Sequence, residues 1–399
     1  MTINAYLRQD GRKGIRNVIV VAYLVECAHH VSREIVFPYR DQEVHLIGFP
    51  GCYPNEYAHR MMERLCTHPN VGAALLVSLG CEGFNKGDLI NFIRKSGRPV
   101  KLISIQDTGG TRNTIAAGKA WIEQTKKQLE QTPRVDMGID ELSVGTICGG
   151  SDATSGLTAN PAMGRAFDFL VERNATCVFE ETGELIGMEH WMAERAATPE
   201  LGREIINTVG KAAKYYSAMG YASFAPGNAD GGLTTIEEKS LGAYAKSGQS
   251  PITGIIKPGD IPLTGGLYLL DVVPDGDPKF GFPNISDNAE IAELIACGNH
   301  IILFSTGRGS VVGSAISPVI KVCANPRTYQ RLEDDMDVNA GRILEGRASL
   351  DEVGQEIYDL ILRVGNGEKT CSEELGHQEF ILTYKTFEPV GPACLPSAA

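Results

Sequence analysis

Short apolar runs alternate with segments of helical periodicity along this 399-residue chain, and no other feature constrains its fold as much. In the first third of the chain, four apolar runs are each followed by a segment whose apolar residues recur at helical spacing. The runs are Asn17–Val25, Val44–Phe49, Ala74–Leu79 and Val100–Ile105, and the helical segments are His29–Phe37, Asn55–Cys66, Lys86–Lys95 and Thr111–Glu130. Strands that alternate with helices predict a parallel sheet with helices on both faces.

The same alternation resumes after Gln131–Asp140, a stretch with the composition of a linker. A chain of this length is too long for one hydrophobic core and suggests more than one domain. We therefore predict an α/β protein of two Rossmann-like parallel-sheet units with helices on both faces. The expected division is an N-terminal α/β domain, 1–135, and a C-terminal α/β domain, 142–399. The later strands are expected at Leu142–Ile147, Cys177–Glu180, Leu267–Val273 and His300–Phe304, and the later helices at Pro161–Glu172, Pro199–Met219, Ile236–Ala245, Ala289–Cys297, Pro326–Leu332 and Leu350–Val364.

The charge and the apolar content exclude several classes of partner. A net charge of −12 argues against nucleic acid and against an anionic membrane surface. The longest apolar run, Val18–Val25, is too short to span a bilayer, and the N-terminus has no apolar leader. Ten cysteines in such a chain indicate free thiols in a reducing compartment, so we expect a cytoplasmic protein.

Several strands run directly into glycines, hydroxyls and carboxylates. Examples are the turns Gly80–Gly83, Cys148–Asp152 and Ser305–Ser310. One such turn alone is most simply an ordinary connection between a strand and a helix. Because ligands bind beyond the carboxyl ends of parallel strands, the repetition predicts one polar cleft that holds a small anion.

The segment Pro226–Gly248 has five glycines in 23 residues. It leads through Thr235 into a predicted helix, and a glycine-rich approach to a helix N-terminus suits an anion. Lys239 lies on the first turns of that helix, where it could neutralise a substrate anion or stabilise an enolate. The simpler alternatives are a long loop before a capped surface helix, and a surface lysine.

Thiols and paired carboxylates are the candidates for a metal site. Cys52, Cys81 and Cys148 each stand beside a glycine just after a strand, where metal or substrate contact and tight packing are both reasonable readings. Glu180 and Glu181 end a strand and could bind a divalent cation, supply a base, or merely cap the next turn. Oxygen-rich loops with few thiols favour Mg²⁺, Mn²⁺ or Fe²⁺ over a structural zinc ion.

Four cations precede the first long strand, among them Arg12 and Arg16. Arginine makes two-point contacts with carboxylate, sulfonate or phosphate oxygens, so both are candidates for substrate binding. A solvated N-terminal arm or a contact between subunits is an equally good explanation.

Five motifs together resemble the altronate/galactarate dehydratase family over nearly the whole chain. They are Arg8–Asn17, Cys148–Asp152, Thr158–Pro161, Gly227–Gly242 and Ser305–Gly309. The resemblance implies a lyase that acts on a 2-hydroxy acid with a divalent metal, most often Fe²⁺, with Mn²⁺ or Mg²⁺ as alternatives. We expect catalytic roles for Lys239, Glu181 and Cys148, metal ligation by Cys52, Cys81 and Glu180, and substrate binding by Arg12, Arg16, Ser151, Asp152, Asn160, Asn228, Thr235 and Arg308.

The chain begins at the Arg/Asp/Gly motif, without the small N-terminal domain that the fused sugar-acid dehydratases of this family carry. The resemblance therefore implies a small partner subunit that supplies that domain, and an oligomeric enzyme. Together with the tail His377–Pro392, it favours a branch that converts (2R)-3-sulfolactate to pyruvate and sulfite. A dehydratase of altronate or galactarate type is the alternative. A non-catalytic ligand-binding subunit is the alternative from another class.

Overall fold

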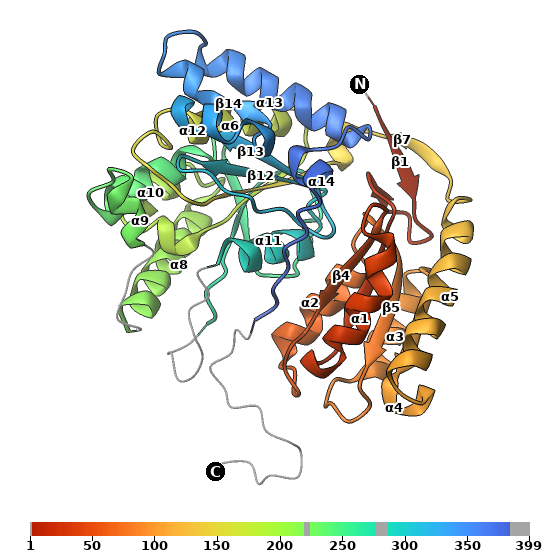
Figure 1. Ribbon diagram of the computed structural model, residues 1–399. Coiled ribbons are helices and arrows are strands. Elements are labelled where there is room, and N and C mark those ends of the chain that lie inside the picture. Colours follow the sequence, from red (N-terminus) through yellow and green to blue (C-terminus); the bar gives the residue numbers. More distant parts are fainter. Residues whose placement is uncertain (1, 219–223, 276–285, 384–399) are drawn as a thin grey trace, which may run out of the picture.

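The computed structural model describes residues 2–218, 224–275 and 286–383, and it contains two parallel sheets and one small antiparallel sheet (Figure 1). The first parallel sheet has the strand order β4-β3-β5-β6. Its strands are β3 (Val18–Tyr23), β4 (Val44–Gly48), β5 (Val71–Ser78) and β6 (Val100–Ser104), and its main helices are α1 (His29–Val36), α2 (Glu56–Cys66), α3 (Lys86–Lys95) and α5 (Thr111–Leu129). All eight lie where the alternation predicts them.

Alternate residues of β3 explain why this sheet has helices on both faces. Val18 and Val20 belong to the apolar cluster that includes α2 and α3, whereas Ile19 and Val21 belong to the cluster that includes α1 and α5. Successive side chains of a strand point to opposite faces, so a strand that is apolar throughout requires cover on both.

The second parallel sheet has seven strands in the order β10-β11-β9-β8-β12-β13-β14. Helices α6 (Ala159–Val171) and α13 (Leu350–Gly365) share one apolar cluster with it, and α11 (Asp287–Ala296) shares another. The strands are β8 (Ser143–Cys148), β9 (Thr176–Phe179), β10 (Ile252–Ile256), β11 (Gly266–Leu270), β12 (Ile301–Thr306), β13 (Val319–Cys323) and β14 (Val338–Asn339). The prediction of an α/β protein with two Rossmann-like parallel-sheet units is confirmed.

Remaining helices surround the second sheet or close the first unit. They are α4 (Ile105–Thr108), α7 (Glu189–Glu194), α8 (Pro199–Ala218), α9 (Pro226–Asp230), α10 (Ile236–Ala245), α12 (Pro326–Arg331) and α14 (Cys371–Leu375). The expected end of α8, Met219, lies outside the described residues. Within the part of the chain that is described, no helix has the length and apolar character needed to cross a bilayer.

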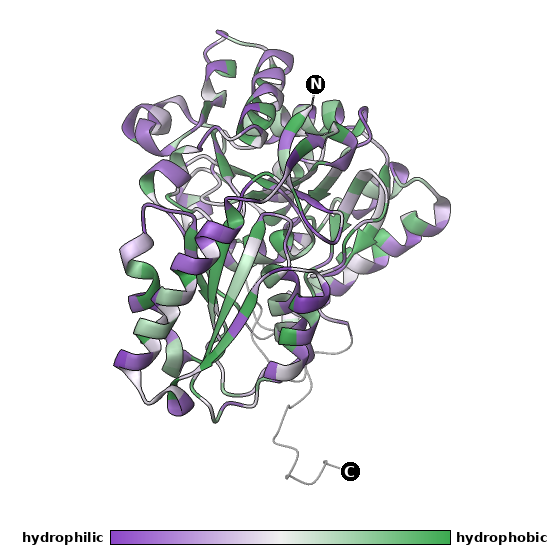
Figure 2. Cartoon of the chain, turned by 90° about the vertical axis from the view of Figure 1, so that its right-hand side faces the viewer, coloured by the Kyte–Doolittle hydropathy of each residue, from purple (hydrophilic) through white to green (hydrophobic). Residues whose placement is uncertain are grey.

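The two parallel sheets share one apolar layer. Helix α2 packs against α11, and residues such as Met61 and Leu294 belong to a single buried cluster. At its edge the Tyr57 hydroxyl donates to the Glu293 carboxylate at 2.6 Å. Apolar residues accordingly concentrate on the strands and on the inward helix faces (Figure 2).

The small antiparallel sheet corrects one expectation. Residues 134–137 of the stretch expected to be a linker form β7 (Arg134–Met137), which pairs with β1 (Ile3–Leu7) in the order β2-β1-β7, where β2 is Lys13–Gly14. Ile3 and Met137 are fully buried opposite each other in this pairing. The strand β7 has only four residues, and its pairing with β1, more than 100 residues earlier in the chain, stabilises it. Local composition does not reveal such a distant pairing.

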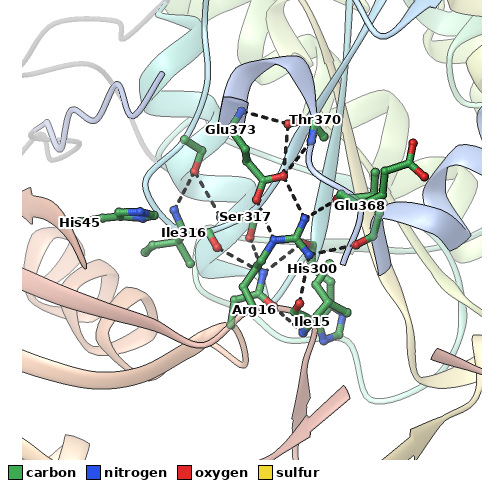
Figure 3. A network of polar contacts seen from close by, with 12 residues as sticks. Ile15, Arg16, His45, His300, Ile316, Ser317, Glu368, Thr370 and Glu373 are labelled. Atoms are coloured by element: carbon green, nitrogen blue, oxygen red, sulfur yellow. Dashed lines mark hydrogen bonds and ion pairs between the residues drawn. The ribbon is translucent and has the colours of Figure 1, made fainter. Parts of the chain in front are cut away.

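Arginines of the N-terminal motif join the two units. The Arg16 guanidinium contacts both carboxylate oxygens of Glu373, at 2.7 and 2.9 Å, and donates to the carbonyls of Val364 and Glu368 (Figure 3). Arg12 donates to the carboxylate of Asp10 and to the Thr67 carbonyl. Burial would raise the pKa of Asp10, but the hydrogen bonds from Arg12 and Arg98 outweigh it and lower that pKa to about 2. The N-terminal motif therefore stabilises the contact between the two units, and we call this contact region the joint.

His300 lies buried at the same joint. Its Nδ1 accepts from the Ser143 backbone N–H at 3.1 Å, and its Nε2 donates to the Lys13 carbonyl at 2.9 Å. This arrangement requires the neutral ring. Burial lowers the pKa of His300 to about 4, although the bond to the Lys13 carbonyl acts in the opposite direction.

A pH-dependent stability follows from His300. In the unfolded chain the ring takes up a proton below about pH 6.5, while the folded protein keeps it neutral, so acid stabilises the unfolded state. We expect the free energy of unfolding to fall by roughly 2 kcal/mol between about pH 7 and pH 5 because of this residue alone. Urea unfolding at both pH values should show a loss smaller by that amount in His300→Gln, whose amide can both donate and accept. The control is His190→Gln at an exposed position. Equal pH dependence in all three proteins would contradict this assignment.

Candidate active site

Cys148 occupies the carboxyl end of β8 and faces two carboxylates. Its Sγ lies 3.2 Å from Glu181 Oε2 and 3.5 Å from Glu184 Oε2. The Cys148 backbone N–H also donates to Glu181 Oε2 at 3.1 Å. All three residues are buried, and one ligand atom from each lies within 4.8 Å of the others. A thiol and two carboxylates thus converge where a parallel sheet places its ligand.

Two buried lysines are paired with these carboxylates. Lys246 forms an ion pair with Glu181, and its Nζ lies 3.7 Å from Cys148 Sγ. Lys239 forms an ion pair with Glu184. Burial alone would lower the pKa of Lys239, but the attraction of Glu184 outweighs it and raises that pKa, so Lys239 is an ammonium ion. Burial raises the pKa of Cys148, and the charge on Lys246 offsets this only in part.

The backbone at Glu181 is strained. Its φ of 84° and ψ of 52° place a non-glycine residue in the left-handed region. The turn Thr182–Glu184 follows at once, and the Thr182 hydroxyl fixes it by donating to the Leu270 carbonyl at 3.1 Å. This abrupt turn after β9 brings both Glu181 and Glu184 to Cys148. Strain of this kind tends to be kept at functional sites, where the surrounding structure supports it.

Further carboxyl groups give the site an excess of negative charge. Glu180 is completely buried and Glu290 nearly so. The carboxylate of Asp287 lies against Gly149, where a methyl group on the glycine would come within 2.2 Å of Asp287 Oδ2. Burial, together with the charge of Glu184, raises the pKa of Asp287 to about 6. Among the described residues, only two buried cations in this region, Lys239 and Lys246, offset these carboxyl groups. A site with more carboxyl groups than cations suits an additional cation.

Among the described residues, the group able to hold a metal is Cys148, Glu181 and Glu184. A mixture of one sulfur and two carboxylate donors fits a transition metal such as Fe²⁺ better than Mg²⁺ or Ca²⁺, which prefer oxygen alone. The donor set therefore fits the metal that the resemblance implies.

A cavity of about 340 Å³ opens beside this group. Its lining combines polar residues such as Cys148, Ser151 and Lys239 with three leucines. The lining consists of Cys148, Ser151, Asp152, Ala153, Ser155, Gly156, Leu157, Asn160, Leu233, Glu238, Lys239, Leu241 and Gly242. Three of the residues expected to bind substrate, Ser151, Asp152 and Asn160, thus line the same cavity as the expected catalytic residues Cys148 and Lys239.

Asp152 and Asn160 have structural partners as well. Asp152 accepts from Thr154 and from Asn325, the latter at 3.1 Å. Asn160 accepts from the Ser305 hydroxyl at 2.5 Å and donates to the Gly242 carbonyl at 2.9 Å. These bonds connect the loop after β8 with Asn325, which follows β13, and they connect α6 with β12 and α10. They hold the cavity wall in place.

The other residues expected in the glycine-rich region position its loops. Asn228 donates to the Ser151 carbonyl at 3.2 Å, and Thr235 caps α10 by accepting from the Glu238 N–H at 3.2 Å. Arg308 donates to the Gly227 carbonyl. None of these three side chains lines the cavity, so the geometry gives them positioning roles at its border.

Several expected site residues lie elsewhere. Arg12 and Arg16 lie near His300 and Ser143, at the amino ends of β8 and β12. Cys148 lies at the other end of β8, and the length of that strand alone separates it from the arginines by roughly 17 Å. Cys52 and Cys81 are exposed in loops of the first sheet and are not among the clustered donors. Glu180 is buried beside the site but is not one of the three clustered ligands either.

Three residues that the structure places at the site, namely Lys246, Glu184 and Asp287, were not predicted from the sequence. Lys246 could have been recognised, because it follows Lys239 by two helical turns and shares its face. Glu184 follows Glu181 by one turn, but only the strained backbone turns both toward Cys148. Asp287 gave no local signal, since its place beside Gly149 depends on the packing of α11 against the second sheet.

Comparison with known proteins agrees with this architecture. Residues 139–387 match the family described as D-galactarate/Altronate dehydratase, C-terminal. Residues 5–130 match the family described as D-galactarate dehydratase/Altronate hydrolase, second domain.

Named relatives cover most of the chain. The (2R)-sulfolactate sulfo-lyase subunit beta of Chromohalobacter salexigens is 34% identical over 96% of this chain and 97% of its own length. The altronate dehydratase of Bacillus subtilis is 28% identical over 96% of this chain and 77% of its own length. The galactarate dehydratase (L-threo-forming) of Escherichia coli is 34% identical over 79% of this chain and 61% of its own length.

The buried pair of Glu181 and Lys246 yields a prediction on stability. In metal-free protein, Glu181→Gln leaves the Lys246 ammonium buried without its partner, which should lower the free energy of unfolding by roughly 3–5 kcal/mol. The double variant Glu181→Gln/Lys246→Met should recover most of that loss in urea unfolding. Glu200→Gln, which breaks the exposed pair with Arg203, is the control and should change stability by less than about 1 kcal/mol. A double variant no more stable than Glu181→Gln would contradict the assignment.

Proposed function

Since the chain belongs to the D-galactarate/altronate dehydratase family and is an enzyme of the lyase class, we propose that it releases sulfite from (2R)-sulfolactate and leaves pyruvate. We propose further that it acts as the large subunit of a two-subunit enzyme. The observation that carries the proposal is the relative named as subunit beta, which aligns with this chain over 97% of its length. The altronate dehydratase of Bacillus subtilis aligns over 77% of its length, which leaves about a quarter of that protein unmatched.

The proposed reaction is a β-elimination. The Cα proton of sulfolactate is removed, the C–S bond breaks with its electron pair on sulfite, and a double bond forms between Cα and Cβ. The resulting enol of pyruvate takes up a proton at Cβ and becomes the ketone. Because the Cα proton is weakly acidic, the negative charge that develops on the substrate carboxylate must be stabilised.

The cavity residues supply that stabilisation. Lys239 lines the cavity as an ammonium ion and would hold the substrate carboxylate. Fe²⁺ bound by Cys148, Glu181 and Glu184 would act as a Lewis acid on the same developing charge. The Ser151 hydroxyl and the leucines that line the cavity would orient the short carbon chain and exclude water.

Asp287 is the carboxyl group that we propose for proton transfer. It lies beside Gly149, the residue that follows Cys148, and it is outside both the cavity lining and the group of clustered ligands. Its carboxylate would take the Cα proton of the substrate. Its raised pKa favours this exchange near neutral pH.

Asp287→Asn tests this role. We expect kcat to fall by about 10²–10⁴-fold while the content of bound iron, measured by atomic absorption, stays that of the wild type. Glu290→Gln, on the same helix one turn further on, is the control for a change of buried charge. Loss of iron in Asp287→Asn, or a kcat no lower than that of Glu290→Gln, would contradict a role in proton transfer.

A sugar-acid dehydratase is the second candidate function. Galactarate dehydratase (L-threo-forming) is also 34% identical over its aligned part, and Ser151, Ser155 and Asn160 could contact the hydroxyls of a sugar acid. The leucines at the cavity favour the shorter sulfolactate. Relatives named as lyases and dehydratases argue against the non-catalytic alternative.

A product assay separates these candidates. With Fe²⁺ and the small subunit of the same organism, the chain should release sulfite and pyruvate in equal amounts from (2R)-sulfolactate. Sulfite is measured with a thiol-exchange dye and pyruvate with lactate dehydrogenase. Formation of a 2-keto-3-deoxy acid from altronate or galactarate, without sulfite from sulfolactate, would contradict the proposal and establish the dehydratase.

A further inference from the structure

Two exposed leucines form a rim at the mouth of the catalytic cavity. Leu157 is 61% exposed and Leu241 is 52% exposed, and both line the cavity that contains Cys148 and Lys239. Leu233 continues the apolar wall inward and is buried. Exposed apolar side chains that gather at a cavity mark either a ligand-binding groove or a surface that another chain covers.

The rim has a fixed shape. Gly156 and Gly242 pack backbone to backbone, so that a methyl group on Gly156 would come within 2.8 Å of the Gly242 Cα. The residues that follow Gly156 and precede Gly242 in the chain are Leu157 and Leu241. Because the Gly242 carbonyl is also held by Asn160, the backbone next to each leucine is fixed in place. A preorganised surface binds a partner at a lower entropic cost.

The charges beside the rim restrict the partner. Glu237 and Glu238 are exposed on the first turn of α10, the helix that carries Leu241. A chain that covers this rim should therefore bring an apolar patch flanked by basic side chains.

We propose that the rim formed by Leu157 and Leu241 is the docking surface of the small subunit, which closes the cavity over the substrate. This rests on the proposed function. The matched families are described as a second domain and a C-terminal domain, and about a quarter of each altronate dehydratase lies outside its alignment with this chain. The relative named as a subunit beta aligns over 97% of its length, so the partner subunit that this name implies is the occupant that we assign to the rim. A cover over the cavity would keep water from the enol intermediate.

The test compares the two leucines of the rim with one exposed leucine elsewhere. Leu157→Ser/Leu241→Ser should weaken binding of the small subunit by at least about tenfold in isothermal titration calorimetry. The amount of small subunit needed for half-maximal sulfite release should rise in parallel. Leu263→Ser is the matched control, because Leu263 is 98% exposed at the opposite end of the second sheet. Bound iron and the circular dichroism spectrum verify that the double variant is folded.

The outcomes distinguish docking from function. If the wild type binds the small subunit and releases sulfite while the double variant binds it equally well, the docking surface is wrong and the function stands. If the wild type releases no sulfite with its small subunit, the proposed function fails, whereas calorimetry still reports on the surface. If the double variant instead converts a dimer of this chain into monomers, the rim is covered by a second copy and the proposal is overturned.

Discussion

Buried charge at the carboxyl ends of β8 and β9 is the constraint on which the rest of the site depends. Glu181 and Glu184 face Cys148, each paired with a buried lysine, and the buried carboxyl groups of Glu180, Asp287 and Glu290 belong to the same region of the described chain. Carboxylates are removed from water only when cations or hydrogen bonds replace it. The ion pairs of Lys239 and Lys246, the strained turn at Glu181 and a donor set that suits a divalent metal all follow from that requirement.

The amino ends of the strands in the second sheet carry structural contacts, whereas their carboxyl ends border the cavity. At the amino ends, Arg16 and His300 join the N-terminal segment to the rest of the protein through buried hydrogen bonds. At the carboxyl ends, glycines and polar turns leave room for a cavity and for the groups that react. Because strands of a parallel sheet all point the same way, the arginines of the joint and the thiol of the site cannot meet. The cationic N-terminal motif therefore stabilises the protein at the end of the sheet opposite Cys148.

Much of the fold was predictable because its strands are apolar on both faces and alternate with amphipathic helices. The strand β7 was not, since Arg134–Met137 is stabilised by pairing with β1 from the other end of the domain. The site was predictable in part: Cys148, Glu181 and Lys239 stand beside glycines or at element ends, where local sequence signals function. Glu184 and Asp287 reach the site only through a left-handed turn and through the packing of α11, which no local pattern encodes.

The central claim is that Cys148, Glu181 and Glu184 hold the catalytic metal. It is tested most directly by an anomalous difference map, recorded at the iron absorption edge from crystals of the enzyme grown with Fe²⁺. We predict one strong peak within bonding distance of Cys148 Sγ and of a carboxylate oxygen from each glutamate. A peak at the loops of Cys52 and Cys81, with none beside Cys148 in crystals of active enzyme, would contradict the account.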